Sequence, residues 1–252
     1  MNFFSNIFNG MCYIFGSIMN AICLGLKEIG IVSVPIGIIF FAIFVTLLML
    51  PITIGQIKFS LAKVKMAPKM QAIYDHYAAK KDLTSEEVKE QSEEIKAVYK
   101  EAGVSPHGKI FGIILQIILL MAMYQVAGNV TRFVPMFNGA SEDAFLLFGR
   151  DVSDIPMTIL KNGFDMVSIL LLAVIFLTMF PFGAILQKNM QNLIRGGLLA
   201  VLWTFLAAKL PVGLCLYWGT KSLMGLITGK IILSVFKRKT GSIQIKTEMK
   251  AE

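Results

Sequence analysis

The chain has 252 residues, of which 56% are hydrophobic and only 16% are charged, and its mean hydropathy is +0.69. A soluble domain of this length has about 25% charged residues, so this composition excludes a disordered chain and argues against an ordinary cytosolic enzyme. The formal net charge is +8, and most of the basic residues lie outside the apolar runs. We therefore expect an integral membrane protein.

The first thirty residues predict an amphipathic helix in the outer membrane interface. Apolar side chains between Phe4 and Ile22 recur at spacings of three and four, while the asparagines fall mainly on the other face. The stretch has neither the basic start nor the small-residue cleavage pattern of a secretory signal, which argues against a cleavable signal peptide.

Five apolar runs follow, each suited to a hydrocarbon core about 30 Å thick, which needs roughly 20 apolar residues in a helix. They are residues 31–54, 110–130, 166–186, 193–208 and 211–232. The predicted fold class is an all-α polytopic membrane protein with five transmembrane helices, the outer N-terminal helix and a cytoplasmic helical hairpin. With five spans, three segments share one side of the membrane and together hold eighteen basic residues: 57–109, 181–195 and the stretch from Lys230. The segments on the opposite side hold five. This imbalance predicts an outside N-terminus and a cytoplasmic C-terminus.

The hairpin is expected in residues 57–109. Its first helix runs from about Ile57 to Lys80, and its second begins at Thr84, which forms a capping box with Glu87. It ends near Gly103, which suits a residue just past a helix end. The hairpin has one weak apolar stripe, which predicts that it is mobile; the stripe consists of Ile73, Tyr77, Val88, Ile95 and Val98. The expected division of the chain is 1–30, 31–56, 57–109, 110–236 with an outer loop at 131–163, and a basic cytoplasmic tail at 237–252.

The sequence offers little for catalysis. It has no nucleophile elbow, zinc-protease motif, P-loop or dinucleotide-binding fingerprint. His76 and His107 show no metal-ligand spacing, and the three cysteines suit neither a disulfide framework nor a metal site. No acidic residue lies in the middle of a predicted span, and Asp165 is expected at the outer interface. We predict no catalytic residue, no metal and no cofactor, and hence a protein that is not an enzyme.

Several polar or amphipathic side chains lie at membrane depth, where polar groups are costly unless they face a bundle interior or a watery cavity. Thr46 can return its hydroxyl to its own helix, whereas Gln116 favours a polar interior. Lys221 lies about ten residues into the last span and predicts a hydrated pocket open to the cytoplasm, with snorkelling to lipid phosphates as the alternative. The candidate groove residues are Thr46, Gln116, Tyr124, Tyr217, Trp218, Thr220 and Lys221.

Four groups of residues occur in an order typical of a known family. They are Pro51, Gln56, Ser60, Met66, Pro68 and Gln71; then Tyr99, Gly103, Pro106, Gly108, Phe111, Gln116 and Tyr124; then Phe145–Phe148 with Asp151–Asp154; and finally Pro211–Trp218. Over nearly the whole chain, this pattern resembles the YidC/Oxa/Alb membrane protein insertases. One departure is Thr46, where the family normally has an arginine in its first conserved span. We hypothesise that Lys221 supplies the missing cation.

The resemblance implies a bacterial plasma membrane protein with a hydrophilic groove in the inner leaflet. The groove passes short hydrophilic segments of clients and releases their apolar helices into lipid, without nucleotide hydrolysis. Expected partners are nascent membrane protein clients and anionic lipids, with the Sec translocon and the ribosome as further candidates, and no specific nucleic-acid sequence. The alternatives are a small secondary transporter or channel subunit, for which internal pseudo-symmetry is expected, and a non-catalytic assembly subunit.

Overall fold

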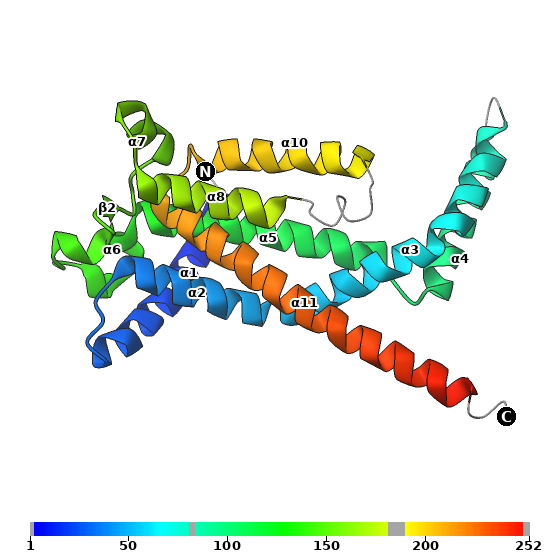
Figure 1. Cartoon of the computed structure of the whole chain (residues 1–252), viewed down its shortest axis with the longest axis horizontal. Coiled ribbons are helices and arrows are strands. Elements are labelled where there is room, and N and C mark those ends of the chain that lie inside the picture. Colours follow the sequence, from blue (N-terminus) through cyan, green and yellow to red (C-terminus); the bar gives the residue numbers. More distant parts are fainter. Residues whose placement is uncertain (1–2, 81–83, 181–189, 249–252) are drawn as a thin grey trace. The chain divides into compact units, whose positions relative to one another are not determined.

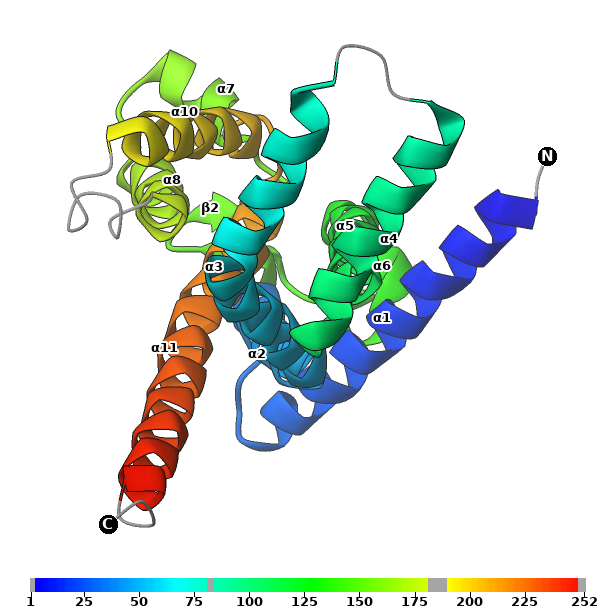
Figure 2. The same ribbon diagram turned by 90° about the vertical axis from the view of Figure 1, so that its right-hand side faces the viewer.

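The computed structural model of the chain describes residues 3–80, 84–180 and 190–248, which are mostly helical (Figures 1 and 2). They form two compact units: Met1–Leu48 with Ile118–Thr228, and Met49–Ile117 with Gly229–Glu252. The elements are α1 (Phe3–Glu28), α2 (Val34–Leu48), α3 (Leu50–Ala78), α4 (Ser85–Glu101), α5 (Pro106–Gly128), α6 (Val130–Phe133), η1 (Pro135–Phe137), η2 (Glu142–Phe145), β1 (Leu146–Leu147), β2 (Arg150–Asp151), α7 (Pro156–Asn162), α8 (Met166–Met179), α10 (Met190–Ala207) and α11 (Val212–Glu248).

Several of these helices can cross a membrane by their length and composition. In the described chain they are Ser5–Glu28, Ile110–Gly128 and Val212–Phe236, and a fourth if Val34–Leu48 and Leu50–Lys63 together form one span. Helix α8 and the stretch Leu193–Ala207 are apolar but shorter, and the predicted third span continues into residues 181–189, which lie outside the described residues. The helical, multi-span class is thus confirmed. The count of five spans and the interfacial position of α1 stay predictions.

The predicted first span, residues 31–54, is interrupted. Helix α2 ends at Leu48 and α3 begins at Leu50. Pro51 explains the break, because a proline has no N–H to donate and its ring clashes with the carbonyl four residues earlier. In the first turn of α3 the missing N–H does no harm. Helix α3 then continues to Ala78, so the expected boundary between residues 56 and 57 falls inside a helix.

In the first unit, α1 packs on α2 and on the short helices after α5. Glycines allow the close approach: a Cβ at Gly37 would meet the Cys23 sulfur, and a Cβ at Gly16 would meet the backbone of Phe133. Phe15 lies edge-on to Phe41, with 6.1 Å between the ring centres. Helices α8 and α10 run side by side in the same unit (Figures 1 and 2). All three cysteines are buried free thiols.

In the second unit, α3 and α4 pack together as the predicted hairpin. Thr84 accepts a hydrogen bond from the Glu87 backbone N–H, and the Glu87 side chain accepts one from the Thr84 backbone N–H, so the capping box is confirmed. At the other end of α4, Gly103 adopts a φ of +63°. The Gly103 N–H donates to the Lys100 carbonyl and the Val104 N–H to the Tyr99 carbonyl, which is the Schellman arrangement.

Candidate functional site

The predicted groove residues of the last span lie on the first half of α11, which packs against α2. A Cβ at Gly213 would lie 3.1 Å from Cδ1 of Ile38, and the rings of Tyr217 and Phe41 have centres 6.2 Å apart. Both contact points advance in the same direction, from Ile38 to Phe41 and from Gly213 to Tyr217. The two helices therefore run parallel at this contact.

This pairing gives the relative heights of Thr46 and Lys221. Thr46 lies five residues beyond Phe41, or about 7.5 Å along α2, and Lys221 lies four residues beyond Tyr217, or about 6 Å along α11. Thr46 and Lys221 thus occupy nearly the same level on two packed helices.

The burial of these side chains differs widely. Thr46 is 7% exposed, and its hydroxyl donates to the Ala42 carbonyl at 2.8 Å, so it returns to its own helix. Tyr217 is fully buried against Phe41, and its hydroxyl has no hydrogen-bond partner among the described residues. A fully buried ring presents no surface to an open groove. Tyr217 therefore supports the packing of α11 on α2.

The next turn of α11 is more open. Trp218, Thr220 and Lys221 are each half-buried. Trp218 meets Trp203 of α10 edge-on, with ring centres 5.4 Å apart, and this contact ties α11 to α10. Trp218 and Lys221 lie about one turn apart on the same side of α11, whereas Thr220 lies on another side.

The two remaining candidates lie on α5. Gln116 and Tyr124 are both exposed, and they belong to different units of the structure, Gln116 to the second and Tyr124 to the first. The contacts described above connect α2, which carries Thr46, to α11, which carries four of the other candidates.

The first unit also contains an ion pair at the start of α8, and its basic partner was not identified from the sequence. Asp165 is 5% exposed, and its carboxylate accepts hydrogen bonds from Arg150 Nε at 2.7 Å and from the Ser168 N–H at 2.8 Å. Hydrogen bonds from Ser168, and then the Arg150 guanidinium, lower the pKa of Asp165. Asp165 therefore caps α8 and ties it to β2. The sequence signal was an aspartate directly before an apolar run.

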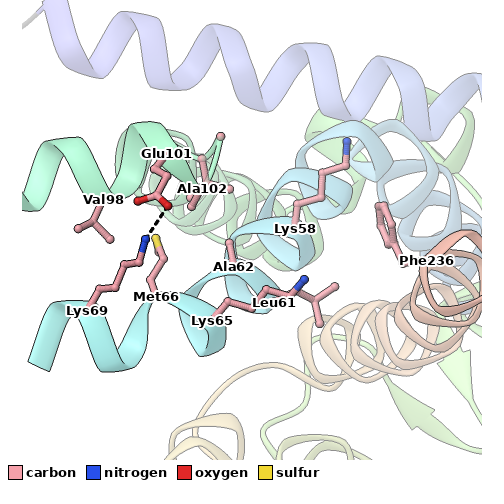
Figure 3. Close-up of a pocket in the computed structure, with 12 residues that line it drawn as sticks. Lys58, Leu61, Ala62, Lys65, Met66, Lys69, Val98, Glu101, Ala102 and Phe236 are labelled. Atoms are coloured by element: carbon pink, nitrogen blue, oxygen red, sulfur yellow. Dashed lines mark hydrogen bonds and ion pairs between the residues drawn. The ribbon is translucent and has the colours of Figure 1, made fainter. Parts of the chain in front are cut away.

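In the second unit a cavity of about 490 Å³ lies at the base of the hairpin (Figure 3). We call it the hairpin-base pocket. Lys69 of α3 pairs with Glu101 of α4 at 2.5 Å, and Lys58 Nζ lies 5.7 Å from the ring centre of Phe236. The sequence signal was the spacing of Lys58, Lys65 and Lys69 along one helix. The principal residues that line the hairpin-base pocket are Lys58, Lys65, Met66, Lys69, Glu101 and Phe236.

We also searched the described residues for a group of side chains that could bind a metal ion. Among the residues that the structure describes, no group of three or more histidine, cysteine, aspartate or glutamate side chains could hold a metal ion.

Comparison with known proteins gives a consistent result. The chain is 26% identical over 227 residues to the membrane protein insertase YidC of Chlamydia caviae, an alignment that covers 84% of this chain and 27% of that protein. It is 26% identical over 185 residues to the membrane protein insertase YidC of Oceanobacillus iheyensis, covering 73% and 68%. With the protein of that name from Campylobacter jejuni it shares 28% identity over 204 residues, covering 81% and 34%.

The chain thus spans about a quarter of the Chlamydia protein and about a third of the Campylobacter protein. The sequence profile of a single family, described as 60Kd inner membrane protein, matches residues 26–239. This match covers both structural units and most of the chain. The chain therefore belongs to the 60Kd inner membrane protein family, in agreement with its resemblance to the YidC/Oxa/Alb proteins.

Proposed function

We propose that this protein is a membrane protein insertase and chaperone. It takes short hydrophilic segments of client proteins through a polar groove in the inner leaflet and releases their apolar helices sideways into lipid. The process requires no nucleotide hydrolysis. The observation that carries this proposal is the family match over residues 26–239, together with relatives that are named membrane protein insertases.

The physical basis is the cost of moving polar groups through hydrocarbon. A charged or amide group at the bilayer centre is strongly disfavoured unless it finds polar partners or water. A groove that brings such partners partway into the membrane shortens the apolar barrier for a client's hydrophilic segment. The half-buried side chains of Trp218 and Lys221, which lie on one side of α11, support such a surface.

Within this groove Lys221 serves as the cation that Thr46 does not supply. The Thr46 hydroxyl is already donated to Ala42 of its own helix, so it has no further proton to offer a client. A lysine ammonium carries three donors and a full charge. Because Lys221 lies at nearly the same level on the adjacent helix, it places a positive charge where the relatives' arginine is expected.

The proposed topology is a five-span chain with an outside N-terminus, α1 in the outer interface and the hairpin in the cytoplasm. The asymmetry of eighteen basic residues against five supports this orientation. Membership of an inner membrane protein family, together with several apolar helices, makes the chain a multi-pass plasma membrane protein. Clients are nascent membrane proteins, and anionic lipids, the Sec translocon and the ribosome are further proposed partners.

The test is reconstitution of the purified protein in liposomes with a small single-span client, with protease protection of the client as the measure of insertion. We expect insertion without nucleotide, a severalfold loss in Lys221→Ala, and substantial recovery in Lys221→Ala with Thr46→Arg. Lys230→Ala is the matched control, because it removes an exposed lysine from the same helix. Full insertion by Lys221→Ala would exclude the relocated cation, and solute flux without insertion would favour the transporter alternative.

A further inference from the structure

Three segments place the hairpin-base pocket at the surface of the membrane. Phe236, in its wall, is the last residue of the candidate span Val212–Phe236. Val104, also in its wall, lies a few residues before the candidate span Ile110–Gly128. The α3 wall begins at Lys58, close to the end of the apolar stretch Leu50–Lys63. In the proposed topology these segments leave the hydrocarbon near this pocket, which then lies at the level of lipid headgroups.

The charge of the pocket is positive. Lys58, Lys65 and Lys69 follow one another at spacings of seven and four, which places them along one face of α3. Glu101 is the acidic residue in the lining, and it pairs with Lys69. Lys58 and Lys65 form no ion pair with any residue that the structure describes. Two ammonium groups are thus available to an anion.

The pocket also has apolar walls. Met66 and Val98 are almost fully buried, and the Phe236 ring lies beside Lys58 (Figure 3). A cavity of about 490 Å³ is of the size that holds small molecules, and it is far smaller than the groove that a helix requires. The suitable ligand is therefore small, anionic at one end and apolar at the other.

We propose that the hairpin-base pocket binds the headgroup of an anionic phospholipid. The lipid phosphate lies between Lys58 and Lys65, and the start of the acyl chains rests on the apolar lining at Leu61, Ala62 and Phe236. Free phosphate shares the same anionic chemistry but has no part to cover the apolar walls. The bound lipid joins α3 to the end of α11 and fixes the base of the hairpin at the membrane surface. This site requires a membrane-embedded chain and is independent of insertase activity.

The test uses the full chain in phosphatidylcholine nanodiscs that contain a minority of phosphatidylglycerol with a photoreactive headgroup. Crosslinked peptides are mapped by mass spectrometry. We expect labelling in residues 58–69 and 101–104. In the double variant Lys58→Gln with Lys65→Gln, this labelling should fall by about fivefold for each lysine removed. Lys63→Gln with Lys96→Gln is the matched control: it removes the same charge from exposed positions outside the pocket, and most labelling should remain.

A further variant, Lys58→Arg with Lys65→Arg, separates loss of the site from loss of the fold, because it keeps both charges and should retain labelling. Equal losses in the pocket variant and the matched control would overturn the proposal, since general surface charge would then explain the labelling. The labelling can also be competed with inorganic phosphate or with unlabelled phosphatidylglycerol. If inorganic phosphate reduces the labelling as well as the unlabelled lipid does, the proposal is overturned in favour of a free-anion site.

Discussion

Phe148 has a backbone conformation that a phenylalanine rarely adopts. It is the one non-glycine in the described chain with a positive φ, +50°, and it is 86% exposed. With Gly149 it forms the two-residue loop between β1 and β2, where Asn-Gly is the preferred pair. Because the exposed ring packs on little, Phe148→Asn should raise the free energy of unfolding by about 1 kcal/mol, measured by thermal unfolding in micelles.

The control for this prediction is Phe164→Asn. Phe164 is almost as exposed, at 84%, but it is not among the residues with positive φ. The same substitution there relieves no backbone strain, so it should leave the melting temperature nearly unchanged. Equal stabilisation by both variants would show that removal of an exposed ring, and not the backbone conformation, is responsible.

Asp165 gives a prediction about acid stability. Its folded pKa is lowered by Ser168 and Arg150, so its contribution to stability is present above the ordinary carboxyl pKa of about 3.9 and is lost as the pH falls through the lower folded value. Asp165→Asn keeps an oxygen to cap α8 but loses the ion pair. Asp165→Ala loses both the cap and the ion pair, and it should lower the free energy of unfolding by about 1 kcal/mol more than Asp165→Asn does. Chemical unfolding between neutral pH and about pH 3 should show that both variants lack this acid-sensitive step.

The residue scale also shows where prediction from sequence stops. The similar level of Thr46 and Lys221 on two parallel helices could be estimated from the sequence, because a helix rises by a constant amount per residue. The environment of Tyr217 could not: it is buried because Phe41, far away in the sequence, packs against its ring. Arg150 was missed for the same reason, since its partner Asp165 belongs to a different element.

Among the elements, the hairpin was the most predictable, because its helix ends are determined by local hydrogen bonds. Thr84, Glu87 and Gly103 all have the predicted roles. The apolar stripe was less accurate: Tyr77 and Val98 are buried, whereas Val88 is 49% exposed. A periodic pattern gives the face of a helix, but which part of that face is covered depends on how far the partner helix extends.

The capping box allows a test on the element itself. Thr84→Ala should destabilise the start of α4 by about 1 kcal/mol and speed amide exchange of Glu86 and Glu87. Ser85→Ala is the control, because the cap is formed by Thr84. Identical exchange in both variants would contradict the assignment of the cap.

The Lys80–Glu87 ion pair predicts how this end of the hairpin responds to acid. The two side chains lie 2.7 Å apart, and the hydrogen bond from Lys80 is the main reason that the pKa of Glu87 falls to about 2. The contribution of Glu87 is therefore present above the ordinary glutamate pKa of about 4.3 and is lost as the pH falls towards 2. Amide protection in the first turn of α4, measured relative to the intrinsic exchange rate at each pH, should fall over this window in the wild type, and less in Glu87→Gln.

For the whole molecule, composition was sufficient to predict a helical membrane protein, but the count of spans depends on finer detail. Helix α8 has 14 residues, about 21 Å at 1.5 Å per residue, against a hydrocarbon core of about 30 Å. Helix α2 has 15, and Pro51 separates it from the apolar start of α3. Whether such short helices complete a crossing depends on the segments that continue them, which hydropathy alone does not resolve.

At the same scale, the hairpin is predicted to serve insertion rather than folding. Over residues 57–109 it has ten lysines against eight acidic residues, and within Ala78–Lys100 the one buried apolar side chain of the described residues is Val98. The first unit contains none of this stretch. Replacing Ala78–Lys100 by a short glycine-serine linker should therefore leave the melting temperature of the membrane-embedded part nearly unchanged while client insertion into liposomes falls severalfold.

The control is Val88→Ser, which changes an exposed position and keeps the hairpin intact. The protein with this substitution should insert clients normally. If the linker variant inserts clients as well as the wild type does, the hairpin has no part in the mechanism.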